Sequence, residues 1–203
     1  VVRPEYPPSY FIQKLTGLTE DILKKAPLWE SVEPEVTELF GQPLIAHNAE
    51  FEKSFLAPFF DEVDDGSGRE SYEDSMPFLA LLFPYKQSFK LENFIVDWGI
   101  AEGEVHRGLE DSIDLLKVLL TAIRVVKSDR EYSQTLMALF HKYDLKKYWY
   151  YELFNLFDDE LEELASAIDF DLDQATKAAL EFERAALYPE MIEAGERPFS
   201  FEF

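Results

Sequence analysis

In the first two thirds of the chain, short apolar runs bounded by turn residues alternate with stretches whose apolar residues recur every three or four positions. The run Leu44–Ala46 follows a Gly-Gln-Pro turn, which predicts a buried strand. From Leu109 to Ile123 the spacing is helical, which predicts one long helix ending near Lys127. Alternating strand and helix signals are typical of layered α/β folds. The sequence therefore predicts an α/β domain over residues 1–128.

Other local signals complete this expected domain. The apolar segment Met76–Phe83 precedes Pro84, and we expect a second strand or a buried extended segment at residues 76–82. Helices are expected where capping residues flank apolar periodicity. These helices are one that follows Thr19 as N-cap, Pro34–Phe40, Glu50–Phe60, and Leu91–Trp98 ended by Gly99.

Beyond residue 128 the strand signals become few and the chain becomes more acidic. Residues 151–203 hold 15 acidic residues and three basic ones, a net charge of −12. Apolar periodicity predicts helices over Tyr132–Phe157 and Leu161–Tyr188. We therefore place a boundary near residue 128 and expect residues 129–203 to form an acidic, all-helical connector or extension.

Composition narrows the classes of function. A hydrophobic content of 47% supports a packed core, and the absence of Cys excludes disulfides, thiolate zinc sites and cysteine nucleophiles. No apolar stretch is long enough to span a membrane, so we expect a cytoplasmic protein without a membrane partner. The net charge of −22 argues against a protein that coats nucleic acid, because phosphates favour basic surfaces. It argues less against a nuclease whose carboxylates hold divalent cations.

Two segments carry residues suited to such chemistry. Asp111 is expected in the first turn of the long helix, where the helix dipole favours a carboxylate, and His106 lies five residues earlier. A histidine beside a metal-bound carboxylate is a plausible general base. Glu52 is expected one turn into a helix that follows His47 and Asn48, at the carboxyl edge of a sheet. The alternative for each segment is a solvated surface acid with no chemical role.

Together the two segments resemble the DEDDh (DnaQ-like) family of 3′→5′ exonucleases. Residues 47–52 match the family motif His-Asn-Ala-x-Phe-Asp, with Glu52 in place of the Asp. His106 and Asp111 match its His-x-x-x-x-Asp motif. Two further landmarks occur in the family's order. They are Thr16-Gly17, ahead of the first of these motifs, and Asp74-Ser75-Met76, between the two.

The resemblance implies a ribonuclease H-like mixed sheet flanked by helices, and a site that binds two Mg²⁺ or Mn²⁺ ions. Carried over by residue, Asp111 and Glu52 become metal ligands and His106 becomes the catalytic base. The substrate, a single-stranded DNA 3′ end, would contact the remaining motif residues, His47, Asn48, Phe51, Thr16 and Gly17.

Two departures qualify this resemblance. Glu52 is longer than Asp by one bond, about 1.5 Å. The family's Asp-x-Glu motif would lie before Val1, and the two Asp-x-Glu triplets present, at 129–131 and 158–160, both follow the last motif. We therefore expect a domain without its N-terminal strands, inactive as it stands. The alternative function is a catalytically inactive exonuclease-like scaffold that docks a polymerase or helicase.

The C-terminal segment suggests a partner. Its order and length resemble the connector between such exonuclease domains and a DinG-like helicase in the same polypeptide. The alternative is a stand-alone exonuclease of the proofreading type. The basic and aromatic run Lys146–Tyr151 has two readings. Its rings can stack single-stranded bases, or they can pack the connector onto the domain.

Overall fold

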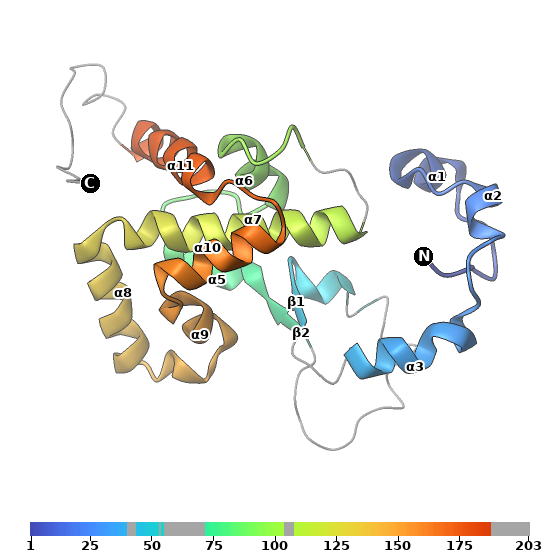
Figure 1. Cartoon of the computed structure of the whole chain (residues 1–203), viewed down its shortest axis with the longest axis horizontal. Helices are drawn as coiled ribbons and strands as arrows, with labels where there is room; N and C mark the ends of the chain where they lie inside the picture. Colours follow the sequence, from blue (N-terminus) through green and yellow to red (C-terminus); the bar gives the residue numbers. More distant parts are fainter. Residues whose placement is uncertain (40–43, 53, 55–71, 104–107, 188–203) are drawn as a thin grey trace. The chain divides into compact units, whose positions relative to one another are not determined.

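The computed structural model describes residues 1–39, 44–52, 54, 72–103 and 108–187. The chain divides into two compact units, which are described separately. The first comprises Val1–Ser75 and Val105–Asp111, and the second comprises Met76–Glu104 and Ser112–Phe203. Figure 1 shows the elements of both in chain order.

The first unit contains short helices and a small sheet. Ser9 caps the first helix by accepting a hydrogen bond from the Ile12 amide, and Gly17 ends it with a left-handed φ of 71°. Thr19 is the N-cap of the second helix, as expected. The third helix begins earlier than Pro34, at Trp29. The elements are α1 (Tyr10–Thr16), α2 (Glu20–Leu23), α3 (Trp29–Leu39), β1 (Leu44–Ala46), helical residues 49–52 and 54, and β2 (Tyr72–Asp74).

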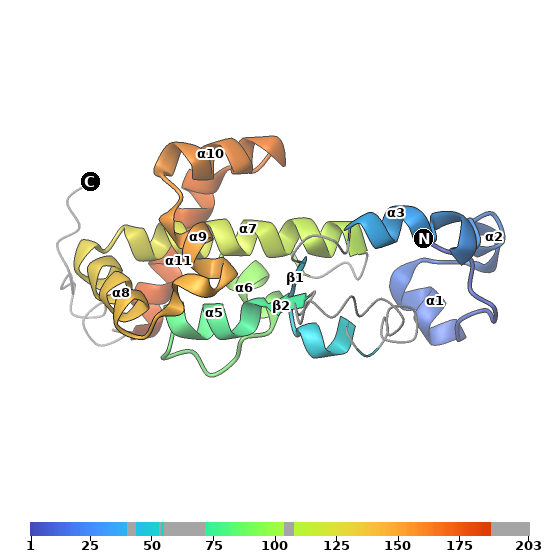
Figure 2. The ribbon, with the colours of Figure 1, turned by 90° about the horizontal axis from the view of Figure 1, so that it is seen from below.

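Strands β1 and β2 pair in parallel, with Leu44 opposite Tyr72 and Ala46 opposite Asp74 (Figures 1 and 2). This confirms a strand at 44–46, although the strand is not buried as predicted, since Ile45 is 39% exposed. Because the strands are parallel, their carboxyl ends meet at one edge of the sheet. The described residues form a two-stranded sheet, consistent with an α/β class, while the ribonuclease H-like arrangement stays a prediction.

The prediction of a strand or extended segment at residues 76–82 is wrong. Residues Ser75–Leu82 form helix α5, and the strand lies just before it, at Tyr72–Asp74. The segment contains no β-branched residue, and Pro77 occupies the first turn, where a missing amide hydrogen costs nothing. A continuous apolar run cannot be assigned to strand or helix by periodicity alone, which is the reason for the error.

The second unit is a packed helical body. Its core gathers the large buried side chains, among them Trp98, Phe78, Phe94, Phe140 and Phe154. Helices α5 and α10 (Asp158–Ala167) lie on opposite sides of α7 (Gly108–Lys127) (Figure 2). The remaining elements are α6 (Leu91–Asp97), α7 (Gly108–Lys127, whose first turn belongs to the first unit), α8 (Arg130–Lys142), η1 (Leu145–Lys147), α9 (Trp149–Asn155), α10 (Asp158–Ala167) and α11 (Leu172–Leu187).

The predicted helices at 91–98 and 109–127 are confirmed, and Gly99 follows α6 with φ 64°. The described residues from 129 to 187 contain helices and no strand, as expected. The single helix predicted over 132–157 is broken, because Asp144 adopts a left-handed conformation and Tyr148 is extended. The single helix predicted over 161–188 is also broken, between Ala167 and Leu172, where Asp169 has a positive φ of 52°. The boundary predicted near residue 128 falls in the turn between α7 and α8 and stays a prediction.

No helix in the described part of the chain is both long and apolar enough to cross a membrane.

Candidate active site at the carboxyl ends of the strands

The candidate site lies where β1 and β2 end. His47 and Asn48 follow β1 directly, Asp74 is the last residue of β2, and Ser75 follows it. Because Ala46 pairs with Asp74, these four residues come from the same edge of the sheet. Open α/β sheets commonly bind ligands at this edge.

Asp74 binds the start of the helix that carries Glu52 (helical residues 49–52 and 54), which we call the motif helix. Its two carboxylate oxygens accept hydrogen bonds from the backbone amides of Asn48 and Ala49, each at 3.2 Å. The helix begins at Ala49, so the carboxylate satisfies amides that lack a partner within the helix and lies at the positive end of its dipole. Asn48 makes this entry turn with φ 66°, a left-handed conformation that asparagine tolerates better than most residues.

His47 is oriented by a buried hydroxyl. Its Nδ1 lies 2.8 Å from Oγ of Ser75, which is fully buried. This hydrogen bond links the residue after β1 to the residue after β2. The imidazole is therefore held against the sheet edge by a group that solvent does not reach.

Glu52 is half-buried and does not point into bulk solvent. Its Oε2 is shielded from solvent and accepts no hydrogen bond from the described residues. Burial raises the pKa of the Glu52 carboxyl, the negative charge of Asp74 raises it further, and a hydrogen bond with its own backbone opposes both effects. Two carboxylates thus influence each other at this edge, and one presents a buried, unsatisfied oxygen.

Asp111 lies in the first turn of α7, as predicted, and one of its carboxylate oxygens is shielded from solvent. It belongs to the same compact unit as residues 47–52 and Asp74. We predicted that the carboxylates of Asp111 and Glu52 would face one metal site, and this stays a prediction. His106, the predicted catalytic base, lies outside the described residues.

The predicted substrate-binding residues differ in setting. Asn48 and Phe51 are exposed, with 58% of Phe51 accessible to solvent, so both are within reach of a ligand. Thr16 and Gly17 have local roles at the end of α1. The Thr16 hydroxyl donates to the Ile12 carbonyl and accepts from the Leu18 amide. Their predicted contact with substrate stays a prediction.

Sequence reasoning treated Asp74 and Ser75 only as a landmark and missed their contacts. Strand β2 is Tyr-Glu-Asp, so no apolar run marked it as a strand, and only the place of Asp74-Ser75-Met76 in the family's order pointed to these residues. Two parallel strands place such residues at one edge. The pairing of the strands, which decides this, is a tertiary feature.

The side chains present match a hard divalent cation in kind. Carboxylate oxygens are the ligands that Mg²⁺ and Mn²⁺ prefer, and the buried Oε2 of Glu52 is an acceptor that a cation would satisfy. Within the described residues, no three His, Asp or Glu side chains are close enough together to hold a metal ion. The edge thus supplies the right donor type without a complete set of ligands.

The chain is similar to curated proteins from Staphylococcus aureus named 3′-5′ exonuclease DinG, among them those of strains USA300, NCTC 8325 / PS 47 and COL. Identity is 27% over 154 residues, which cover 75% of this chain and 16% of each relative. The similarity supports a relation to an exonuclease family. No family model and no solved structure matches the chain.

Proposed function

We propose that this chain is part of a metal-dependent DEDDh-type 3′→5′ exonuclease that degrades single-stranded DNA. The similarity to proteins named 3′-5′ exonuclease supports the class of activity. The observation that carries the site is the half-buried Glu52, with its unsatisfied oxygen, beside Asp74 at the sheet edge. Cytoplasmic action in replication or repair, next to a helicase domain or a polymerase, belongs to the same proposal.

In this mechanism Glu52 and Asp111 would hold the divalent ions. When bound, Mg²⁺ or Mn²⁺ supplies the positive charge that stabilises the attacking and leaving oxygens of phosphodiester hydrolysis. His106 accepts a proton from the water that attacks the terminal phosphorus. The bond from phosphorus to the 3′ oxygen of the preceding nucleotide breaks. That oxygen takes up a proton and becomes the 3′ hydroxyl of the shortened strand, and a nucleoside 5′-monophosphate is released. Asp74 and Ser75 position the motif by holding Asn48, Ala49 and His47.

Substrate contacts fall to the exposed part of the motif. The Phe51 ring is exposed on the first turn of the motif helix, where it can stack on a base. Asn48 offers an exposed amide side chain next to it. Thr16 and Gly17 contribute to the same binding surface in this proposal.

The first test is cleavage of a labelled single-stranded oligonucleotide by the native polypeptide that carries this sequence, with and without Mg²⁺. His106→Ala should lower turnover about 10²–10⁴-fold, since general-base catalysis contributes that much. Asp111→Asn should also weaken metal binding, because it removes a charged ligand. Cleavage that persists in EDTA would contradict the metal mechanism.

The informative position is Glu52. Glu52→Asp restores the acid of the family motif and should retain or raise activity, whereas Glu52→Gln removes the charge and should lower it strongly. Glu50→Gln, on the exposed side of the same helix, is the matched control and should leave activity unchanged. Equal activity of the Asp and Gln variants would show that Glu52 is a surface acid without a catalytic role.

The second candidate function is an inactive scaffold that docks a polymerase or helicase. The observation in its favour is that the described residues gather no three metal-ligating side chains. Calorimetric titration with Mn²⁺ separates the two candidates. Saturable binding that Asp111→Asn weakens supports the enzyme, and no binding to the native polypeptide supports the scaffold.

A further inference from the structure

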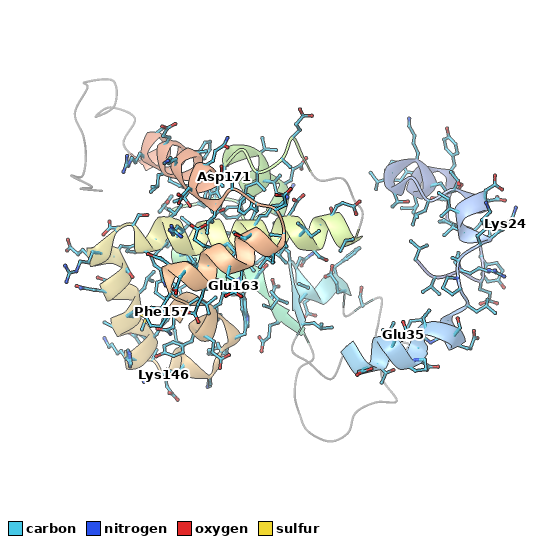
Figure 3. All side chains as sticks on the ribbon, in the orientation of Figure 1. Lys24, Glu35, Lys146, Phe157, Glu163 and Asp171 are labelled. Atoms are coloured by element: carbon cyan, nitrogen blue, oxygen red, sulfur yellow. The ribbon has the colours of Figure 1, made fainter. Side chains whose placement is uncertain are left out.

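The turn between α8 and α9 carries a distinct surface, formed by Lys142, Tyr143, Lys146, Lys147 and Tyr148. We call it the basic-aromatic surface. The 3₁₀ helix η1 packs against both α8 and α9, so the turn has support on two sides. Lys146, at its centre, is labelled in Figure 3. All five residues belong to the second unit.

The structure divides the aromatic run of this segment into a packing part and an exposed part. Trp149, Tyr150 and Tyr151 are partly buried and contact the core. Tyr148 is 38% exposed and Tyr143 is 60% exposed. Packing onto the domain therefore applies to Trp149, Tyr150 and Tyr151, whereas Tyr148 stays accessible for stacking on bases.

Tyr148 ends a stack of three rings that starts in the core. The ring of buried Phe78 lies 5.2 Å from that of Tyr150, at an interplanar angle of 6°. The Tyr150 ring lies 5.3 Å from that of Tyr148, at 11°. Stacking on Tyr150 thus fixes the orientation of the Tyr148 ring. Sites that bind single-stranded nucleic acid present such oriented aromatic rings to the bases.

Each exposed tyrosine has a lysine ammonium over its ring. The distances from Nζ to the ring centroid are 5.2 Å for Lys142 over Tyr143 and 5.4 Å for Lys147 over Tyr148. Within the described residues, Lys142, Lys146 and Lys147 form no ion pair, whereas Lys86, Lys117 and Arg124 do. These three cations remain available to phosphates.

The surface has the opposite charge to the rest of the molecule. Residues 142–148 contain three lysines and one acid, Asp144, in a chain with a net charge of −22. At physiological salt, charges farther away than about 8 Å are largely screened. A polyanion at this turn therefore responds mainly to the local lysines.

We propose that the basic-aromatic surface binds single-stranded nucleic acid. The ammonium groups of Lys142 and Lys147 turn from the rings of Tyr143 and Tyr148 to phosphates, which Lys146 also pairs with, and bases stack on the ring faces that the two lysines leave. The contact lies outside the proposed active site. If the proposed nuclease function holds, this surface is a second binding site for the substrate strand. Exposed aromatic faces interleaved with cations form the common design of sites that bind single strands without sequence preference.

The test is the fluorescence anisotropy of a labelled oligothymidylate, titrated with the whole chain in EDTA. Tyr148→Leu removes the ring and should weaken binding at least about fivefold, since stacking on one aromatic contributes that much. Tyr148→Phe keeps the ring and should bind as the wild type does. Tyr143→Ala, at the more exposed ring, should also weaken binding.

Salt dependence tests the lysines. Lys146→Gln and Lys147→Gln should each reduce the slope of log affinity against log salt by about 0.7, as expected for a lost phosphate contact with a single strand. Lys177→Gln is the matched control, because Lys177 is exposed on α11 of the same unit. An unchanged slope in the turn variants, or an equal change in the control, overturns the proposal.

Two further measurements separate the outcomes. Thermal unfolding of Tyr148→Leu shows whether the variant is folded, and Tyr143→Ala tests the surface without disturbing the three-ring stack. Oligouridylate in a parallel titration distinguishes RNA from DNA as the ligand. Strand binding by the native polypeptide without cleavage in Mg²⁺ would refute the nuclease proposal alone, and cleavage with strand binding unaffected in the turn variants would refute this inference alone.

Discussion

At the scale of single residues, Asp74 links the end of β2 to the residues after β1, because its carboxylate accepts hydrogen bonds from the amides of Asn48 and Ala49. Replacing Asp74 with Ala leaves two amides at a helix start without this acceptor, which typically costs about 1 kcal/mol. We expect hydrogen exchange at these two amides, followed by NMR, to become several-fold faster in Asp74→Ala.

Glu73→Gln is the control for this change, because it alters the neighbouring carboxylate of the same strand and should leave the two amides protected. If protection at Asn48 and Ala49 is the same in Asp74→Ala as in the wild type, the carboxylate does not hold the motif helix. Asp74 would then have no positioning role.

At the scale of elements, Tyr132 connects the first turn of α8 to the end of α5. Its hydroxyl donates to the Leu82 carbonyl at 2.9 Å. Tyr132→Phe leaves this carbonyl without the donor, and we expect a loss of about 1 kcal/mol of unfolding free energy at pH 7. Urea denaturation measures the difference, and Tyr143→Phe, whose ring is 60% exposed, should show none.

The pH dependence of this difference follows from the pKa of Tyr132. Burial raises that pKa above 10.0, and the charge of Asp129 raises it further. Below the pKa of the unfolded chain, the neutral hydroxyl contributes its full stability. As pH rises above about 10, the unfolded state loses the proton first, so the wild type loses stability relative to Tyr132→Phe. A stability difference that stays constant from pH 8 to 11 would contradict this.

At the scale of the whole molecule, the buried Glu183 joins segments far apart in the sequence. Its carboxylate accepts hydrogen bonds from Trp98 Nε1 at 2.7 Å and the Tyr85 hydroxyl at 3.0 Å, and it pairs with Lys86 at 2.8 Å. Helix α11 is thus tied to α6 and to the loop after α5. Every contact lies within the second unit.

Removing one partner of a buried ion pair leaves the other charge uncompensated. We therefore expect Glu183→Ala to lower the unfolding free energy by about 3 kcal/mol or more. Lys86 would keep only the more distant Asp97, at 3.9 Å. Glu181→Ala, exposed on the same helix, should change it by less than about 0.5 kcal/mol. Similar urea midpoints for the two variants would show that the buried carboxylate contributes no net stability.

Local patterns were sufficient for some elements. The apolar period from Leu109 to Ile123 predicted α7, because a helical face repeats every three to four residues whatever packs against it. Gly99 predicted the end of α6 for a local reason also, since a left-handed residue stops a helix. The same reasoning failed at residues 76–82, where an apolar run without alternation carries no period that identifies its structure.

The sequence by itself determined α6, α7, the strand after the Gly-Gln-Pro turn, and the order of the motif residues, because each depends on neighbours within a few positions. Only the tertiary structure decided that Asp74 and Ser75 hold Asn48, Ala49 and His47, because the partners lie 25 to 28 residues apart and meet through strand pairing. It likewise decided which tyrosines of the turn are exposed, since the burial of a ring depends on the surface packed against it. Contacts of that range leave no period in the sequence.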